Sequence, residues 1–424
     1  MTTGPSTPLV SVLMVNYNHE DVIGHSIESV LNQTYGNFEF IIVDDGSTDA
    51  SCQIIESYED PRIVVHRLPE NGHISAATNV GFSLVKGEFL ARIDSDDVWL
   101  PEKLEKQMAY MQETGCDVVF STIGLIDENG ADISAENPDY LAIFDVDMQK
   151  KEEWLELLFF ECNHLSHPSV LMRTEVMRTV GNFDLAYAQS HDLDYWVRIA
   201  HRYDMHVLHE PLVNMRRYME ESGGVTNNSN DSHASHSRFR NEYSLIREHY
   251  FDNMPDDLFI AAFGSHFKNP DAHTAVQLAI EKAFLLVGPK KNDDFVCWAG
   301  VDALKQLLDN PESCEVLAQE YHFTALDYYE LTSHFLLSDP DLEGRYDDLL
   351  EAFTTASALL EDERAECNRL RKAEADAQEL IAGLSKHFEA CLERIAQLEG
   401  ELEQIHSSTS WKLTQPLRSL KKDK

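Results

Sequence analysis

The sequence predicts an α/β fold with a mostly parallel sheet flanked by helices, followed by a helical region and a long coiled coil. Three observations support this prediction. Short apolar runs alternate with helix-like segments through the first part of the chain, as in folds with right-handed strand–helix–strand crossovers. The residues after 236 show mainly helical patterns. Towards the C-terminus, apolar residues follow a heptad repeat.

Buried strands are predicted where a short apolar run is bounded by turn residues. The predicted strands are residues 10–15, 38–43, 63–66, 88–93, 117–120, 169–173, 206–208 and 213–216. The predicted helices are residues 21–33, 50–58, 75–85, 101–114, 154–160 and 193–203. Pro101 supports one of these starts, because the first turn of a helix tolerates proline well.

The chain is predicted to contain four segments. Residues 1–235 form the α/β domain, in which the Gly-, Ser- and Asn-rich residues 219–236 are expected to be a mobile loop or lid. Residues 236–341 form an acidic helical region without a recognisable motif. Residues 342–405 form the coiled coil, and residues 406–424 form a basic amphipathic tail.

The coiled coil is predicted from spacing alone. Apolar residues recur at alternating steps of three and four from Tyr346 to Ile405, and only Glu363 and Glu374 interrupt them. A heptad sustained over this length predicts a left-handed coiled coil, and therefore a homo-oligomer. The alternative is a long helix packed on its own domain.

The composition argues against nucleic-acid binding, because a net charge of −40 repels a phosphate backbone. The seven cysteines are scattered, which is typical of reduced thiols. Residues 1–8 lack a secretory pattern, and no apolar run reaches the roughly 20 residues that span a bilayer. We therefore expect a cytoplasmic protein. Its basic, Trp411-containing tail is expected either to contact the inner face of the membrane or to pair with the acidic body.

The strongest candidate site is the turn Asp94-Ser95-Asp96-Asp97, which ends an apolar strand. Three carboxylates repel one another, so their proximity predicts a divalent cation, Mg²⁺ or Mn²⁺, held by Asp94, Asp96 and Asp97. A diphosphate would supply further ligands, and the metal would neutralise charge on the leaving phosphate. Helix capping by Asp97 is the alternative interpretation.

Polar residues also follow two earlier strands, at Asn16-Tyr17 and at Asp44-Asp45. Ligands of open α/β sheets bind at the carboxyl ends of strands, so these residues and the acidic turn are expected to face one crevice. We expect Tyr17 to lie against a nucleotide base and Asp45 to accept a hydrogen bond from it, beside Asn16 and Asp44. The chain lacks GxGxxG, which argues against a dinucleotide-binding oxidoreductase.

From Pro8 to about Arg217 the chain resembles the family 2 glycosyltransferases, which have the GT-A fold. The matching motifs are Val10–Asn18, Ser29–Thr34, Phe38–Asp49, Asn71-Gly72, Ala77 with Asn79, Gly87–Phe89 and Asp94–Asp97. The resemblance implies a nucleotide-diphosphate-sugar donor, with a UDP-sugar favoured. It places Tyr17 and Asp45 near the base, Asp94 on the donor and Asp96 on the metal, with Asp97 close by.

The resemblance also implies a single displacement that inverts the anomeric carbon and needs a general base. The acceptor motif resembles Ser190–Arg198, in which Asp192 would be that base. The alternative is that Asp192 caps a helix beginning at Leu193. Neither a QxxRW motif nor membrane spans are found, which implies non-processive, hexosyltransferase-like activity. The chain departs from the family at Thr78, where Arg is frequent, and at Tyr218, which stands in place of a metal-binding His.

The sequence thus predicts a metal-dependent glycosyltransferase acting on a glycan or lipid-linked acceptor in cell-surface polysaccharide biosynthesis. Residues 410–418 resemble a tail found on bacterial surface-glycan transferases. One alternative is a scaffold whose catalytic domain has decayed and which assembles partner enzymes through the coiled coil. Another is a nucleotidyltransferase, but residues 16–20 lack the glycine-rich basic loop that such enzymes usually carry.

Overall fold

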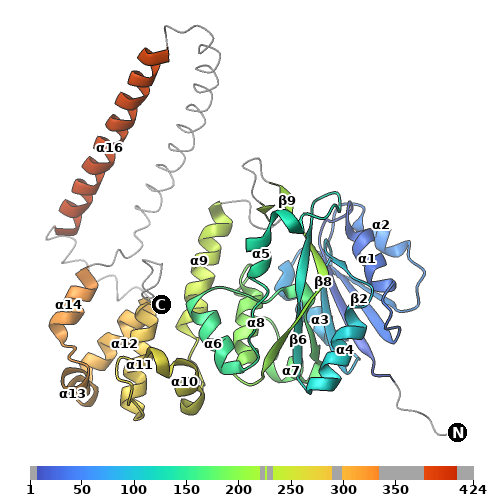
Figure 1. Ribbon diagram of the computed structural model, residues 1–424. Coiled ribbons are helices and arrows are strands. Elements are labelled where there is room, and N and C mark those ends of the chain that lie inside the picture. The colour runs from blue at the N-terminus through green and yellow to red at the C-terminus, as the bar shows by residue number, and fades with distance from the viewer. Residues whose placement is uncertain (1–6, 220–224, 227–232, 289–297, 334–376, 408–424) are drawn as a thin grey trace. The chain divides into compact units, whose positions relative to one another are not determined.

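The computed structural model describes residues 7–219, 225–226, 233–288, 298–333 and 377–407 (Figure 1). The chain divides into two units, Met1–His334 and Phe335–Lys424. Within the described ranges, every helix is too short or too polar to cross a bilayer.

The first unit is built on an eight-stranded sheet of order β3-β2-β1-β4-β7-β6-β8-β5. Its strands are β1 (Val10–Asn16), β2 (Phe38–Asp44), β3 (Ile63–Arg67), β4 (Phe89–Asp94), β5 (Val98–Trp99), β6 (Val118–Ile126), β7 (Leu171–Arg173) and β8 (Met205–Arg216). Strands β3, β2, β1 and β4 are parallel, as are β6 and β8. The short strand β7 runs antiparallel to β4 and β6, and β5 runs antiparallel to β8. The prediction of a mostly parallel sheet is confirmed, with these antiparallel strands making the sheet mixed.

Two details of the sheet differ from the prediction. The segments predicted as two strands, 206–208 and 213–216, belong to one strand, β8. Pro211 interrupts their apolar pattern, and the pairing of β8 with β6 shifts register where Pro211 lies opposite Thr122. Strand β5 was not predicted, because a two-residue strand has no periodic signal.

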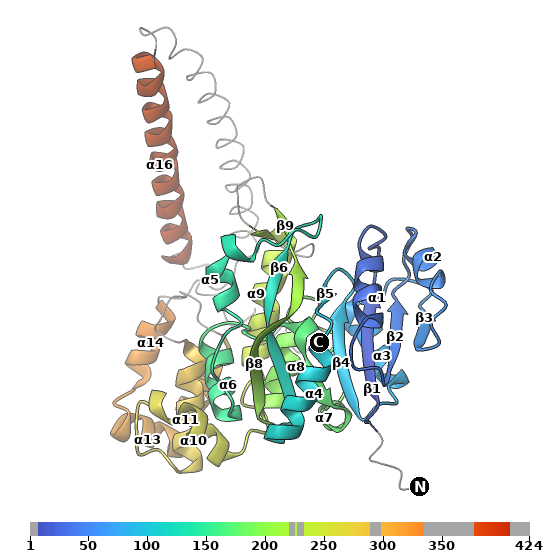
Figure 2. The same cartoon turned by 45° about the vertical axis from the view of Figure 1, so that its right-hand side comes forward.

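Helices cover both faces of the sheet (Figure 2). Along β1, Val10, Val12 and Met14 join one core cluster, while Leu13 and Val15 join the other, as the two-residue period of a strand requires. The helices of this domain are α1 (Ile23–Leu31), α2 (Ser51–Glu56), α3 (His73–Leu84), α4 (Lys103–Thr114), α5 (Pro138–Ala142), α6 (Lys151–Phe160), α7 (Thr174–Val180) and α8 (His191–Ala200), with short 3-10 turns η1 (Ser134–Glu136) and η2 (His167–Ser169). The first core cluster includes residues of α1 and α4, and the second includes residues of α3, α6 and α8.

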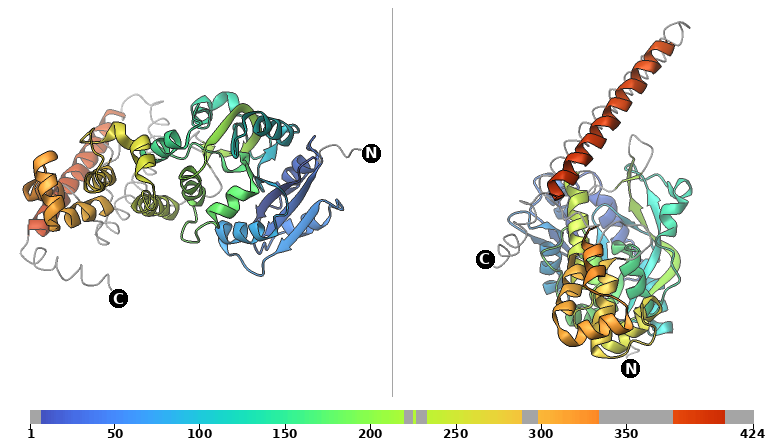
Figure 3. Two further views of the ribbon diagram at one scale, coloured as in Figure 1. Left: turned by 90° about the horizontal axis from the view of Figure 1, so that it is seen from below. Right: turned by 90° about the vertical axis from the view of Figure 1, so that its left-hand side faces the viewer.

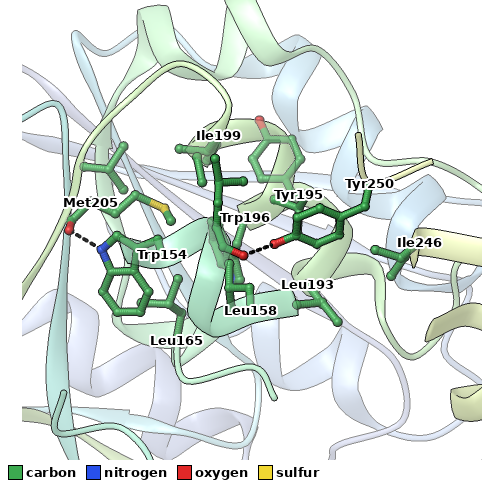
Figure 4. Packing of buried hydrophobic residues seen from close by; sticks show 14 of the residues in the cluster. Trp154, Leu158, Leu165, Leu193, Tyr195, Trp196, Ile199, Met205, Ile246 and Tyr250 are labelled. Carbon is green, nitrogen blue, oxygen red and sulfur yellow. Dashed lines mark hydrogen bonds between the residues drawn. The ribbon is translucent and has the colours of Figure 1, made fainter. Parts of the chain in front are cut away.

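Buried hydrogen bonds hold α6 in the core, and a ring contact holds α8 there (Figure 4). The Trp154 indole donates to the carbonyl of Met205 over 2.6 Å, and the Tyr250 hydroxyl donates to the carbonyl of Leu155 over 2.8 Å. The Trp196 ring of α8 meets Phe120 of the sheet edge-to-face, with 4.8 Å between centroids. The hydrogen bonds therefore fix α6 against β8 and Tyr250, whereas α8 is held against the sheet by ring packing.

The predicted helical region is confirmed as helical. It contains α9 (His233–Glu248), α10 (Asp256–Phe263), η3 (Gly264–His266), α11 (Ala275–Val287), α12 (Trp298–Asp309), α13 (Pro311–Glu320) and α14 (Ala325–Ser333), which Figure 3 shows from two further directions. The Phe159 ring of α6 lies 5.0 Å from Tyr250 and 5.4 Å from Phe263, measured between centroids. The core of the α/β domain therefore continues into this region.

The segment predicted as a mobile loop, 219–236, overlaps three elements. Strands β9 (Tyr218–Met219) and β10 (Val225–Thr226) form an antiparallel pair, and α9 begins at His233. Residues 220–224 and 227–232 lie outside the described residues.

The second unit contains one described helix, α16 (Ala377–Ser407). Its apolar side chains Phe388, Leu392 and Ile395 are exposed, at 58%, 49% and 39%. The remainder of the predicted coiled coil, residues 342–376, and residues 408–424 of the predicted tail lie outside the described residues. A helix is therefore observed over the second half of the predicted coiled coil, while self-association stays a prediction.

Candidate active site

Three polar side chains end neighbouring strands at one edge of the sheet. Asn16, Asp44 and Asp94 are the last residues of β1, β2 and β4, and β1 lies between the other two strands. In the register of the sheet, Asn16 is opposite Asp44, and Val15 is opposite Asp94. The sheet thus brings the two predicted polar groups together at the carboxyl ends of parallel strands, where ligands of open α/β sheets bind.

Asn16 and Asp44 use their hydrogen-bonding groups mainly within the protein. The Asn16 amide donates to Asp44 over 2.8 Å and to the Ser47 hydroxyl over 3.1 Å. Burial raises the pKa of Asp44, but hydrogen bonds from Ser47, Asn16 and Cys52 outweigh it and hold that pKa below its usual value. Both residues are buried, at 0% and 1% exposure, and their hydrogen bonds stabilise the turn after β2.

Asp45 and Tyr17 flank this turn. The Asp45 carboxylate accepts a 2.9 Å hydrogen bond from the backbone N–H of Gly72, and burial raises its pKa. Gly46 follows with φ of +75°, and a Cβ there would lie 2.7 Å from the backbone of Glu70. Glycine therefore allows the turn to lie against residues 70–72. Tyr17 is 42% exposed, so part of this residue is accessible to a ligand.

The acidic turn contains two kinds of carboxylate. Asp94 and Asp96 are partly exposed, whereas Asp97 is buried at 3%. Asp97 accepts a 2.8 Å hydrogen bond from the backbone N–H of Arg216, whose side chain donates to the carbonyl of Asp96 over 2.9 Å. Burial raises the pKa of Asp97 well above its usual value, and Asp96 and Asp94 raise it further. Asp97 is thus held against β8, whereas Asp94 and Asp96 have carboxylates that are more accessible to a ligand, and the predicted part of Asp97 in metal binding stays a prediction.

Arg92 joins the acidic turn to the predicted base. Its buried guanidinium donates to the Thr78 hydroxyl over 2.7 Å and lies 3.4 Å from a carboxylate oxygen of Asp94. It also attracts Asp192 electrostatically. Thr78 stands at a position where the resembled family often has Arg. Its hydroxyl here accepts a hydrogen bond from Arg92, an arginine of strand β4.

Asp192 lies in the first turn of α8. It accepts hydrogen bonds of 2.8 Å from the Asn163 amide and 2.8 Å from the backbone N–H of Leu193. Burial raises the pKa of Asp192 to about 7, and Asp94 adds to that rise. The helix begins at His191, with Ser190 as its N-cap, so Asp192 is not the residue at the cap position. A carboxylate with this pKa can take a proton near neutral pH.

Three histidines and Ser95 complete the surroundings of the acidic turn. The His167 ring lies 3.8 Å from Asp94 and 5.3 Å, between centroids, from the His191 ring. Burial lowers the pKa of both rings, so both are neutral at pH 7. His19 Nδ1 lies 2.7 Å from the Ser95 hydroxyl, which ties the segment after β1 to this turn.

Within the described part of the chain, no three His, Cys, Asp or Glu side chains are gathered closely enough to hold a metal ion by themselves. The oxygens of Asp94 and Asp96 still suit Mg²⁺ or Mn²⁺, which commonly bind through one or two carboxylates plus substrate phosphates. Tyr218, beside β8, lies near enough to Asp96 for that carboxylate to raise its pKa, after burial. Tyr218, the position at which the sequence departs from the resembled family, therefore lies near the acidic turn.

Sequence reasoning missed several residues of the site. Asn163 lies in an irregular segment after α6, and nothing in its sequence surroundings marks it as a partner of Asp192. Glu242 accepts hydrogen bonds from backbone N–H groups of residues 188–190, just ahead of α8, and it lies on α9, in a region where no motif was recognised. Arg92 could have been predicted from the sequence. It lies in an apolar strand two residues before Asp94, and a buried arginine needs a partner.

Comparison with known proteins gives consistent matches. The model of the family described as Glycosyl transferase family 2 matches residues 11–137. An uncharacterized glycosyltransferase of Methanocaldococcus jannaschii is 33% identical over 215 residues, which cover 49% of this chain and 71% of that protein. The O-antigen biosynthesis glycosyltransferase WbnJ of Escherichia coli is 33% identical over 195 residues, which cover 45% of this chain and 71% of that protein.

Other similar proteins are covered less fully, over 50% to 64% of their own length. The crystal structure of S. aureus TarS 1-349 in complex with UDP-GlcNAc is 19% identical, with a TM-score of 0.46. That match covers 73% of this chain and 83% of the TarS chain. These values are too low for the TarS complex to locate a ligand here.

Proposed function

Because the chain belongs to glycosyl transferase family 2, we propose that it moves a sugar from a nucleotide-diphosphate sugar to a hydroxyl group of a cell-surface glycan precursor. A UDP-sugar is the favoured donor. The acceptor class rests on the similarity to an O-antigen biosynthesis enzyme, and the acceptor itself is a glycan or a lipid-linked glycan.

The observation that carries this proposal is the relation of Arg92 to two carboxylates. It lies against Asp94 of the acidic turn and attracts Asp192 on α8. If the donor diphosphate binds at Asp94 and Asp96 and the acceptor approaches Asp192, donor and acceptor would meet beside Arg92, and this supports the proposal.

We assign donor and metal binding to six residues. Tyr17 would stack on the base, and Asp45 would accept a hydrogen bond from it, while Asn16 and Asp44 hold the turn between them. Asp94 and Asp96 would hold a divalent cation, Mn²⁺ or Mg²⁺, together with the diphosphate oxygens. When bound, the cation would neutralise charge that develops on the leaving phosphate.

The proposed reaction is one inverting displacement. The acceptor oxygen attacks the anomeric carbon and forms the new glycosidic bond as the bond from that carbon to the phosphate oxygen breaks. The nucleoside diphosphate leaves with the electron pair, and the acceptor proton passes to Asp192. The pKa of about 7 is suitable for this role, because the base is half ionised at neutral pH, mostly ionised above it, and still binds a proton readily.

The experiment that tests the function is a donor screen. Purified protein is incubated with Mn²⁺ and a panel of UDP-, GDP- and dTDP-sugars, and release of the nucleoside diphosphate is measured with and without glycan acceptors. Metal-dependent release from one nucleotide class is expected. If no donor in the panel is bound or hydrolysed, the proposal is wrong and the scaffold alternative is favoured.

We further propose that the chain forms a homo-oligomer through residues 342–405 and contacts the inner membrane face through residues 406–424. The exposed apolar residues of α16 support the first proposal, because an isolated helix of this kind gains stability by burying them against a second copy. The basic, tryptophan-containing composition of the tail supports the second.

A further inference from the structure

A buried glutamate on α9 binds the chain just ahead of α8. Glu242 is 4% exposed. Its carboxylate accepts hydrogen bonds from three consecutive backbone N–H groups, those of Ala188 at 2.9 Å, Gln189 at 2.9 Å and Ser190 at 2.7 Å. Bonds from N–H groups to an ionised acceptor are stronger than neutral ones, so this is a firm attachment between two elements far apart in sequence.

The attachment lies next to the proposed base. Ser190 is the N-cap of α8, and Asp192 lies in the first turn of that helix. A helix start carries a partial positive charge, so a carboxylate that binds the N–H groups leading into it, that of the N-cap Ser190 among them, also stabilises the helix end. Any shift of residues 188–190 would shift the backbone that carries Asp192.

The same helix also holds the other neighbour of Asp192. On α9, the Tyr243 hydroxyl donates to the carbonyl of Glu161 over 3.1 Å, and Arg247 donates to the carbonyl of Phe159 over 2.8 Å. Two residues after Glu161 comes Asn163, which donates to Asp192. Helix α9 thus fixes both segments that determine where the Asp192 carboxylate lies.

We propose that Glu242 is a positioning residue of the transfer reaction, which acts through residues 188–190 to hold Asp192 in place for the acceptor hydroxyl. This rests on the proposed function of Asp192. A displacement of about 1 Å at a reacting group can cost roughly a hundredfold in rate, so the positioning is expected to be visible in kcat.

The chain offers a matched control in Glu281 on α11. It is also buried, at 1% exposure, and it accepts hydrogen bonds of 2.8 Å from the backbone N–H groups of Lys268 and Asn269. None of its recorded partners belongs to the candidate active site. Glu242→Gln and Glu281→Gln therefore remove the same kind of interaction, one beside Asp192 and one within the helical region.

The experiment compares the full-length wild type, Glu242→Gln, Glu242→Asp and Glu281→Gln. Glu242→Asp keeps the buried charge on a shorter side chain. This variant is used for the comparison if Glu242→Gln does not fold. We measure kcat and donor KM against pH, the unfolding temperature, and hydrogen–deuterium exchange of the amides of residues 188–195. Glu242→Gln is expected to lower kcat by about tenfold or more, with donor KM within about twofold, and to move the acid limb of the pH profile.

Glu242→Asp should give an intermediate kcat, and Glu281→Gln should lower only the unfolding temperature. Faster exchange at residues 188–195 is expected in the Glu242 variants alone. If Glu242→Gln and Glu281→Gln lose stability equally, with no change in kcat, pH profile or this exchange, Glu242 is merely structural. If the wild type uses no donor, the proposed function fails. The exchange experiment then still decides whether Glu242 holds the start of α8, and unchanged exchange overturns the inference.

Discussion

The side-chain amide of Asn163 donates a 2.8 Å hydrogen bond to the carboxylate of Asp192. This bond favours the ionised carboxylate, whereas burial and the charge of Asp94 favour the protonated form. The balance sets the pKa of Asp192 to about 7, so a general base with this environment is half ionised near neutral pH.

The first prediction is the pH dependence of transfer. Because only ionised Asp192 can accept a proton, kcat should fall as the pH drops below about 7. Asn163→Leu removes a hydrogen bond that lowers the pKa, so the acid limb of the profile should move to higher pH. Initial rates from pH 5 to 9 check this. If the acid limb stays at the same pH in Asn163→Leu, Asn163 does not affect the ionisation that limits the rate, and the prediction is wrong.

The second prediction separates two neighbouring carboxylates. Asp96→Asn should reduce Mn²⁺-dependent donor hydrolysis by roughly a hundredfold while the protein stays folded. Asp97→Ala should lower the free energy of unfolding by about 1–3 kcal/mol, because it leaves the buried N–H of Arg216 without its acceptor. Asp97→Asn keeps an acceptor oxygen and serves as the control. If Asp96→Asn left donor hydrolysis unchanged, the assignment of metal binding to Asp96 would be wrong.

Much of this arrangement was predictable from the sequence, because apolar runs mark buried strands and carboxyl ends of parallel strands meet at one edge. Asn16, Asp44 and Asp94 were placed correctly on that basis. The orientation of each carboxylate was not predictable. Asp96 and Asp97 are adjacent and chemically alike, and only the contact of Asp97 with β8, more than a hundred residues away, distinguishes them.

The same limit explains the residues that were missed. Asn163 and Glu242 act through hydrogen bonds to residues 29 and 52 to 54 positions away, and such pairings follow from packing rather than from local pattern. The predicted coiled coil is the opposite case. Its heptad spacing is a strong local signal, but one chain does not show whether a second copy packs against it, so self-association stays a prediction.

The third prediction concerns the nucleotide base. Tyr17→Ala should weaken UDP binding in the presence of Mn²⁺ by about tenfold, because the exposed ring loses its stacking contact with uracil. Tyr17→Phe keeps the ring and should bind nearly as the wild type does. Titration calorimetry measures both. Equal affinities for the alanine variant and the wild type would remove Tyr17 from the donor site.

The fourth prediction concerns self-association. Phe388 and Ile395 are seven residues apart and lie at the same position of the proposed heptad. Replacing both by Asp should convert the oligomer to a monomer, because buried charges destabilise a coiled-coil seam. Glu389→Ala, off the seam, should leave the assembly intact. Light scattering gives the masses. A monomeric wild type, or an unchanged mass in the double variant, would contradict the proposal.

A crystal structure of the chain with UDP and Mn²⁺ would show directly where the donor binds. We expect the metal on Asp96 and Asp94 together with the diphosphate, uracil between Tyr17 and Asp45, and the Asp192 carboxylate facing the end of the diphosphate. A nucleotide bound elsewhere, or a metal that avoids both carboxylates, would contradict this expectation.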